Sequence, residues 1–456
     1  MMMKKKFILD VNPSNGEIIE KIKCSSTAEI ASALKLAKKA FKTWNDTPLK
    51  NKLIIFRKIL KDLEKDKKEI ARIIASEVGK SYESALKEIE TSISLIEINC
   101  LISSSILNNI TNLEGYIVTE IVREPIGVCA LITTWNNPLK MPVSILSPAI
   151  LSGNTVIFKP SEYAPISGKK IFEIYNRSLP RGVINIVQGV EEVSDVLINS
   201  DINFISFSGR KEIGKKIMSS ACNKLMKVIS EINGKYSMIV LNDSNLKKAA
   251  SYAAESCFRN LDNLSCSPDR IFVEDKCISK FEDYLISESK KYKINGSNKI
   301  DINPIINDES RNHIFQQIEE AKKRGVKVLS GGIKSNAKGF FIEPTILSGV
   351  TDKHNFINSD YNIPVVRIQK VKSKDEAVEK ANNFSLKSGV TIWTSNISKA
   401  VYIAKKLDIE KIGINQGFRS NNHTMKTSNL AEIEKNEFIE RFKVFTRQKR
   451  ITYNKI

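Results

Sequence analysis

The chain has 456 residues, of which 41% are hydrophobic and 27% charged. These are ordinary globular values, so a disordered chain and a collagen-like repeat are excluded, and the length predicts two to four domains. The net charge is +20, from 56 Lys and only 15 Arg against 51 acidic residues. Because Lys is a point charge, whereas Arg has the planar fork that suits bases and phosphates, this surplus favours a solvated surface over nucleic-acid recognition.

Cysteine and histidine usage excludes further kinds of site. The seven Cys are scattered without a CxxC pair, which argues against a disulfide framework or a zinc site and predicts a reducing, cytoplasmic compartment. The three His are isolated, so neither a metal site nor a Ser-His-Asp triad is expected. No apolar run reaches membrane-spanning length, and the basic start MMMKKKF lacks a following apolar segment of signal length. We therefore expect no metal and no membrane partner.

The chain begins with two predicted strands. A dense turn signal at 12–16 separates apolar stretches at 7–11 and 18–22. A helix follows, because Ser26 and Glu29 have the spacing of a capping box.

Two more helices are predicted before residue 80. One opens at Thr47 and Pro48, with Pro48 at the first helical position. The other runs from Lys67 toward Gly79.

From residue 127 onward, strands alternate with helices. Strands are predicted at 127–133, 155–159, 183–187 and 204–207, with helices through Leu151, through Tyr175 and near 193–198 between them. A second alternating region runs from about 249 to 401. This pattern predicts an α/β fold of right-handed βαβ units, with parallel sheets covered on both faces.

Polar segments follow the predicted strands, where parallel sheets bind dinucleotides. Lys159 and Glu162 end one strand, and a carboxylate there can accept hydrogen bonds from ribose hydroxyls. The turn at Gly209 and the helix after it can face a pyrophosphate. The segments are TWNNP at 134–138, KPSE at 159–162, FSGR at 207–210 and EINGK at 231–235, followed by NLDNLSC at 260–266 and Arg270.

The order and spacing of these segments resemble the aldehyde dehydrogenase superfamily, in the general look of its semialdehyde and aminoaldehyde branches. The resemblance covers nearly the whole chain and includes NPSNGE, REPIGV, GNTV, LPRGVINIV and IEPT. It implies oxidation of a small-molecule aldehyde to an acid with NAD or NADP. In that reaction a Cys thiolate attacks the aldehyde, hydride leaves to the nicotinamide, and a Glu activates water.

The resemblance also implies a domain organisation. A Rossmann-type cofactor domain would span 1–232, with oligomerisation strands at about 108–124. An α/β catalytic domain would span 233–420, and a C-terminal oligomerisation segment 421–456. A homodimer or homotetramer is therefore expected.

Several site residues carry over by position. Asn136 matches the Asn that stabilises the oxyanion, Glu231 the general base, and Lys159 with Glu162 the pair on the adenosine ribose. Glu162 predicts NAD over NADP because a carboxylate repels a 2′-phosphate, although Arg210 could soften that preference. Further cofactor-binding positions fall on Trp135, Gly209, Arg210 and Asp360.

The nucleophile position is the main departure. Asn260 and Arg270 match the flanks of the family's nucleophile motif, and a gap-free fit between them places Ser265 where the family has its Cys. A Ser hydroxyl needs a strong base nearby, whereas a thiol is partly ionised near neutral pH. Cys266 could serve only if the loop shifted by one residue.

Other departures gather at the same end of the site. Positions matching the adenosine end are mostly retained, and those matching the nicotinamide and thiol end mostly are not. Three functions follow: an active NAD(P)-dependent aldehyde dehydrogenase, a non-catalytic nucleotide-binding or structural scaffold, and a nucleic-acid binder using the basic surface. The departures are Ile145, Asn233, Asp262, Asn263, Asn362 and the stretch 425–430, which lacks the family's glycines.

Overall fold

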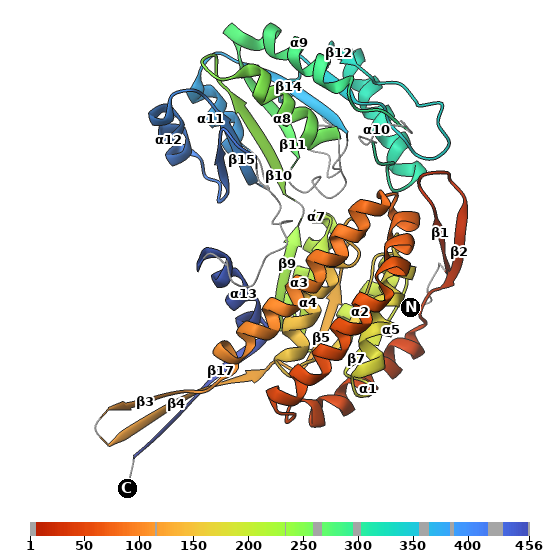
Figure 1. Cartoon of the computed structure of the whole chain (residues 1–456), viewed down its shortest axis with the longest axis vertical. Coiled ribbons are helices and arrows are strands. Elements are labelled where there is room, and N and C mark those ends of the chain that lie inside the picture. The colour runs from red at the N-terminus through yellow and green to blue at the C-terminus, as the bar shows by residue number, and fades with distance from the viewer. Residues whose placement is uncertain are drawn as a thin grey trace. The chain divides into compact units, whose positions relative to one another are not determined.

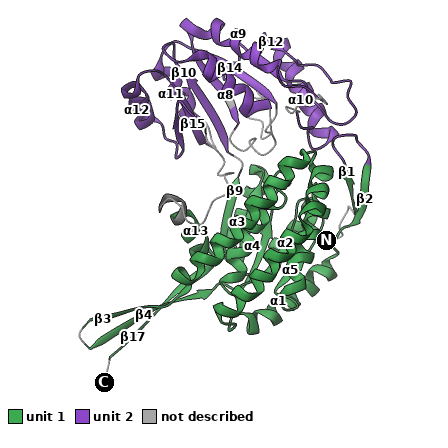
Figure 2. Cartoon of the chain, viewed as in Figure 1, with its two compact units in different colours: residues 1–10, 18–232, 421–456 green, residues 11–17, 233–420 purple. Residues whose placement is uncertain are grey.

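A computed structural model describes residues 6–114, 116–232, 234–258, 267–294, 302–354, 364–383, 387–417 and 432–454. The chain divides into two compact units (Figures 1 and 2). Unit 1 contains residues 1–10, 18–232 and 421–456, and unit 2 contains residues 11–17 and 233–420.

Unit 1 is built on a five-stranded parallel sheet in the order β7-β6-β5-β8-β9. Strands β5 and β6 are buried at every residue, as expected of parallel strands with helices on both faces. The α/β fold predicted from the alternation is therefore confirmed. The strands are β5 Val128–Ile132, β6 Thr155–Lys159, β7 Ile184–Ile186, β8 Phe204–Gly209 and β9 Lys227–Ile232; the helices between them are α4 Lys140–Leu151, α5 Pro165–Ser178, α6 Glu191–Asn199 and α7 Lys211–Cys222.

The N-terminal strands β1 (Phe7–Val11) and β2 (Ile18–Lys23) pair as predicted. Helix α1 (Thr27–Trp44) opens with the predicted capping box, in which the Glu29 amide donates to Ser26 Oγ and the Ser26 amide donates to the Glu29 carboxylate. The hydrogen bond from the Ser26 amide is the main reason that the pKa of Glu29 falls to about 2. Local sequence alone therefore fixes the start of this helix.

The next helices differ from the prediction. A single helix, α2 (Leu49–Val78), replaces the two expected before residue 80, and Pro48 is its N-cap residue with extended backbone angles. The helix ends at Gly79, whose φ of 70° is the left-handed conformation that glycine adopts without steric cost. Helix α2 stays continuous because its apolar face packs on α3 (Tyr82–Leu107) and α5 along its length.

Helix α3 is long and apolar enough to cross a membrane by length and composition, contrary to the expectation that no apolar run reaches this length. Its most apolar window is 56% buried inside the protein, and the helix packs against α2 and α4. That burial is typical of the core helix of a globular unit.

A separate three-stranded antiparallel sheet in unit 1 has the order β17-β4-β3. All nine residues of β17 pair with β4. In Figure 1 this sheet is a narrow ribbon that extends away from the helices of its unit. Its strands are β3 Ile110–Glu114, β4 Ile117–Pro125 and β17 Thr446–Asn454, and α13 Glu432–Val444 precedes β17.

Unit 2 has a seven-stranded sheet in the order β12-β13-β14-β11-β10-β15-β16, parallel except for the edge pair β12 and β13. Helix α8 packs on this sheet through a run of buried alanines that continues into the main core of the unit. The strands are β10 Lys235–Val240, β11 Pro268–Glu274, β12 Lys327–Ser330, β13 Thr345–Ser348, β14 Val365–Val371, β15 Lys387–Trp393 and β16 Ile412–Ile414; the helices are α8 Leu246–Phe258, the 3₁₀ turn η2 Asp275–Cys277, α9 Ile278–Ser289, α10 Asp308–Lys323, α11 Lys374–Asn382 and α12 Ile397–Lys406.

Candidate active site

The predicted site residues of unit 1 meet at one edge of its parallel sheet. Strand order reverses between β5 and β8, which are neighbours in space although β6 and β7 separate them in sequence. Lys159 ends β6 opposite Ile132 at the end of β5, and Gly209 ends β8 opposite Ile232 on β9. The carboxyl edge around such a reversal is where open α/β sheets bind ligands. The structure thus brings four strand ends together as the sequence predicts.

Lys159 is buried at this edge, and its ammonium lies 3.9 Å from the carboxylate of Glu162. Burial lowers the pKa of Lys159, while the charge of Glu162 acts in the opposite direction. The Glu162 side chain is 29% exposed, so its carboxylate can accept hydrogen bonds from a ligand. An ammonium beside a partly exposed carboxylate suits a diol such as that of a ribose.

The loop after β5 carries Trp135 and Asn136, both half-buried. The Thr134 hydroxyl donates to the side-chain oxygen of Asn136 at 2.7 Å. This contact uses the oxygen end of the amide, so the nitrogen end is the donor that Asn136 can offer to a ligand. An amide N–H in a fixed place is the kind of group that stabilises an oxyanion.

A buried ion pair between Lys80, just before helix α3, and Glu88 on that helix holds the same loop. Lys80 Nζ lies 2.6 Å from Glu88 and donates to the side-chain oxygen of Asn137 at 3.0 Å. The second oxygen of Glu88 accepts hydrogen bonds from the backbone N–H groups of Leu139 and Lys140, at 2.9 and 3.0 Å. Glu88 therefore supplies the acceptor that the first turn of α4 needs.

The start of helix α7 faces the same sheet edge. Its N-cap residue, Arg210, is exposed and makes no side-chain capping bond. A Cβ at Gly214 would lie only 3.0 Å from Ile232 Cδ1, so glycine lets the first turn approach β9 closely. A helix start with this close approach to the sheet suits a pyrophosphate.

Glu231 lies near the end of β9, opposite Ser208 on β8. It is exposed, on the edge strand of the sheet. Its carboxylate is therefore accessible to water, as a general base for hydrolysis needs to be.

Three predicted site residues lie outside the described residues: Ser265, Cys266 and Asp360. The same holds for the departures Asn233, Asp262, Asn263, Asn362 and the stretch 425–430. Of the flanks of the nucleophile motif, Arg270 is described, and it is buried in strand β11.

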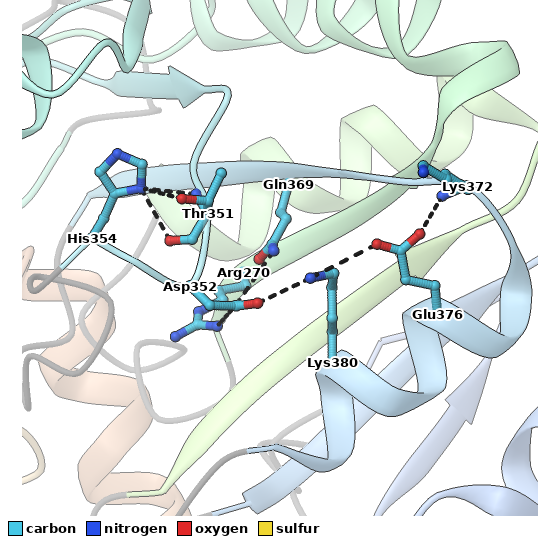
Figure 3. Close-up of polar contacts among 8 residues, drawn as sticks. All are labelled: Arg270, Thr351, Asp352, His354, Gln369, Lys372, Glu376 and Lys380. Atoms are coloured by element: carbon cyan, nitrogen blue, oxygen red, sulfur yellow. Dashed lines mark hydrogen bonds and ion pairs between the residues drawn. The ribbon is translucent and has the colours of Figure 1, made fainter.

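Arg270 belongs to a polar cluster of unit 2 that centres on Asp352 (Figure 3). The Asp352 carboxylate accepts from Arg270 at 3.3 Å, from Lys380 at 2.9 Å and from Gln369 at 3.4 Å. Burial raises the pKa of Asp352, but these hydrogen bonds and positive charges outweigh it and lower the pKa overall. Figure 3 shows the carboxylate between Arg270 of β11 and Lys380 of α11. This cluster joins strand β11 to helix α11 through Asp352.

Sequence reasoning missed the buried carboxylates that hold the helix starts. Glu77 accepts hydrogen bonds from the backbone amides of Ile166 and Ser167, at 2.6 and 2.7 Å, and so caps the start of α5. Burial, together with the nearby Asp10, raises the pKa of Glu77 well above its usual range. A charged residue on the apolar face of a predicted helix is the one sequence signal that could have indicated such a role.

Among the described residues, no group of three His, Cys, Asp or Glu side chains could hold a metal ion. The groups on the sheet edge instead suit an organic ligand with hydroxyls and phosphates. The fold and this edge together define a Rossmann-type α/β protein.

Comparison with known proteins extends this assignment. The family model described as the aldehyde dehydrogenase family matches residues 2–449. Aldehyde dehydrogenase, cytosolic 1, of Mus musculus is 31% identical over 415 residues, which cover 89% of this chain and 83% of the mouse protein. The chain therefore belongs to the aldehyde dehydrogenase family, as its motifs predict.

Solved structures agree in fold. A point mutant of an aldehyde dehydrogenase from Bacillus cereus has a TM-score of 0.88 at 26% identity, covering 99% of this chain and 94% of that one. A betaine aldehyde dehydrogenase of Staphylococcus aureus in complex with NAD+ has a TM-score of 0.87 at 24% identity, covering 99% and 92%. These similarities include both units.

Proposed function

We propose that this chain oxidises an aldehyde to a carboxylic acid with NAD. The observation that carries the proposal is the meeting of Lys159, Glu162 and Asn136 on one sheet edge, at the reversal of strand order. Family membership and the NAD+ complex of the S. aureus relative support it.

Each residue has a defined task in this proposal. Lys159 and Glu162 hold the adenosine ribose, and the start of α7 receives the pyrophosphate. Bound NAD supplies the hydride acceptor. The attacking group would be the side chain of Ser265, or that of Cys266 if the loop is shifted by one residue, and the amide of Asn136 would donate to the oxygen that becomes negative in this attack. Loss of hydride to NAD would leave an acyl ester or thioester on that side chain, and Glu231 would take a proton from the water that hydrolyses it to the acid.

The domain assignment belongs to the same proposal. Residues 1–232 would bind the cofactor, 233–420 would carry the nucleophile segment, and 421–456 would contribute to oligomer contacts. A cytoplasmic location is proposed with it, since the cysteines are scattered along the chain.

A second candidate is a non-catalytic member of the family that binds nucleotide or acts as a scaffold. Ser265 at the nucleophile position favours it, because no His lies near in sequence to take the hydroxyl proton. Under this proposal the cofactor edge binds NAD, but no aldehyde is turned over.

One experiment separates the two candidates. NAD and NADP are titrated by calorimetry, and the full chain is assayed with acetaldehyde, benzaldehyde, betaine aldehyde and malonate semialdehyde. Binding with turnover supports the enzyme, and binding without turnover supports the scaffold. Tighter binding of NADP than of NAD would contradict the role given to Glu162. Absence of binding would contradict the enzyme and the nucleotide-binding form of the second candidate.

Mass spectrometry after incubation with aldehyde and NAD identifies the nucleophile. We expect no acyl adduct on Ser265. An adduct on Cys266 would indicate that the loop places the neighbouring thiol in the reacting position. An adduct on Ser265 would show that the hydroxyl is activated in spite of its surroundings in sequence.

We also propose that the β17-β4-β3 sheet makes contacts between copies of the chain. Its strands expose large apolar side chains, which a monomer rarely retains on a narrow ribbon. The exposed residues are Ile110, Leu113, Ile117, Ile451 and Tyr453. Light scattering coupled to gel filtration should therefore give a dimer or a tetramer, and a monomer at micromolar concentration would contradict the proposal.

A further inference from the structure

The amide of Asn136 can present either of two chemically different ends. Its oxygen accepts hydrogen bonds and its nitrogen donates them. A developing oxyanion is stabilised only by the nitrogen end, so a half-turn about the last side-chain bond would turn a stabilising group into a repulsive one. Some feature of the protein therefore has to select the orientation.

Thr134 holds one of these two orientations in the structure. Its hydroxyl donates to Asn136 Oδ1 at 2.7 Å, two residues away on the same loop. The bond occupies the oxygen end and turns the nitrogen end away from Thr134. Thr134 is itself half-buried and lies two residues after the end of β5, so the strand fixes the position of its backbone.

A second contact fixes the backbone on the other side of Asn136. The next residue, Asn137, accepts a hydrogen bond from Lys80 Nζ at 3.0 Å. The Lys80 side chain is fully buried, and its 2.6 Å pair with Glu88 holds the ammonium in place. Glu88 in turn binds the first amides of α4. The loop is thus tied at both ends, once through a side chain and once through a buried ion pair.

We propose that Thr134 and Lys80 are positioning residues for Asn136. Thr134 holds the amide in the orientation in which the nitrogen end can donate to a ligand, and Lys80, through Asn137, sets where the loop lies. The inference rests on the proposed oxyanion role of Asn136 and adds the residues that make that role possible. Neither positioning residue touches the aldehyde or the cofactor in this proposal.

Kinetics test the proposal in the full chain with NAD and the best aldehyde of the panel. Asn136→Ala should lower kcat about 10²- to 10³-fold, as expected for the loss of an oxyanion donor. Thr134→Val should lower kcat about tenfold with KM nearly unchanged, because the donor remains but its orientation is no longer selected. Thr134→Ser keeps the hydroxyl and should restore most of the rate.

A double variant shows whether Thr134 acts through Asn136. Thr134→Val should cost nothing further in the Asn136→Ala background, since there is no amide left to orient. A tenfold loss in both backgrounds would overturn the proposal. Thr155→Val is the matched control, because Thr155 starts β6, at the opposite end of that strand from Lys159, and its hydroxyl donates to the Ala37 carbonyl.

Asn137→Ala tests the second contact in the same assay. It removes the acceptor of Lys80 without breaking the buried ion pair, so kcat should fall severalfold while the urea midpoint changes little. An unchanged kcat would overturn the part assigned to Lys80.

The inference can also be tested by structure determination if the wild-type chain turns over no aldehyde. Absence of turnover would contradict the proposed enzymatic function, but the orientation of the Asn136 amide can still be observed in variant structures. Neutron structures, which distinguish Oδ1 from Nδ2, should then show the Asn136 amide turned by a half-turn in Thr134→Val and in its original orientation in Thr134→Ser. The original orientation of the amide in both variants would overturn the proposal by itself.

Discussion

A carboxylate of unit 1 and one of unit 2 lie in different surroundings. In unit 1, the carboxylate of Glu88 is buried and accepts hydrogen bonds from backbone amides at the start of α4. In unit 2, the Asp352 carboxylate accepts side-chain donors while its own side chain remains 48% exposed. A buried ion that loses its partner stays uncompensated, whereas water replaces the partner of an exposed one. Similar distances should therefore correspond to very different free energies.

The largest loss in the free energy of unfolding is expected when Glu88 is substituted. Glu88→Ala leaves the buried ammonium of Lys80 without its pair and two amides of α4 without their acceptor. Breaking a buried pair in this way costs about 3–5 kcal/mol in the free energy of unfolding. Urea denaturation followed by circular dichroism would measure the loss.

Glu90→Ala is the matched control, on the same helix. Glu90 pairs with Lys67 at 2.9 Å, but its side chain is 46% exposed. The expected loss is about 0–1 kcal/mol. Equal losses in the two variants would show that burial does not decide the strength of these pairs.

Lys52 is a second buried ammonium, and it tests the effect of burial on stability through pH. It lies on α2 with 5% exposure, 5.4 Å from the centre of the Trp44 ring. Burial lowers the pKa of Lys52 to about 8, against 10.5 for the ordinary side chain. Between these two values the unfolded chain keeps a proton that the folded chain has lost, so the contribution of Lys52 to stability rises with pH.

Lys52→Met should therefore be more stable than the wild type at pH 7, by up to about 3 kcal/mol. The difference should shrink as pH rises from 8 to 10.5, and urea unfolding at a series of pH values would measure it. The neighbouring exposed Lys50 supplies the control Lys50→Met, which should show no such trend. A constant difference across this range would mean that the Lys52 ammonium is not destabilised by burial.

Lys159 and Glu162, the pair proposed to bind ribose, combine a buried ammonium with a partly exposed carboxylate, so they allow buried and exposed charges to be compared within one site. Glu162→Ala should raise the Kd for NAD about tenfold, or about 1.4 kcal/mol. The Kd for NADP should change less, because the carboxylate that repels a 2′-phosphate is removed as well. Calorimetric titration of both cofactors measures the two effects.

Glu173→Ala, on helix α5, is the control for that titration. It removes a carboxylate of the same unit that lies late in α5, away from the carboxyl edge of the sheet. An equal increase in the Kd for NAD in both variants would indicate that the overall charge of unit 1, and not a contact with ribose, determines the affinity.

The difference between local and long-range interactions explains what the sequence could predict. The capping box of α1 involves residues three apart, and β5 and β6 are unbroken apolar runs, so both are visible in the chain itself. The roles of Glu88 and Glu77 depend on amides 51 and 89 residues further on. No local pattern specifies such a partner.

The same reasoning applies to the candidate site. Residues at strand ends, such as Lys159 and Gly209, follow from the alternation together with the family resemblance. The merging of two expected helices into α2 depends on packing against α3 and α5, which outweighs the local signals. The bond from Thr134 to Asn136 was missed although it is local, because a Thr at a strand end has many roles and only the folded loop selects one.

The smallest loss in the free energy of unfolding is expected for a substitution in unit 2. Asp352→Asn removes the negative charge that Arg270 and Lys380 share, but water can reach the half-exposed position. The expected loss in unfolding free energy is about 1 kcal/mol, and it should decline in high salt because exposed pairs are screened. Asp375→Asn, whose carboxylate pairs with Lys406 at 3.2 Å and is 54% exposed, should lose less still. If Asp352→Asn instead costs as much as Glu88→Ala and is insensitive to salt, the buried guanidinium of Arg270 depends on this carboxylate as strongly as Lys80 depends on Glu88, and the contrast between the units fails.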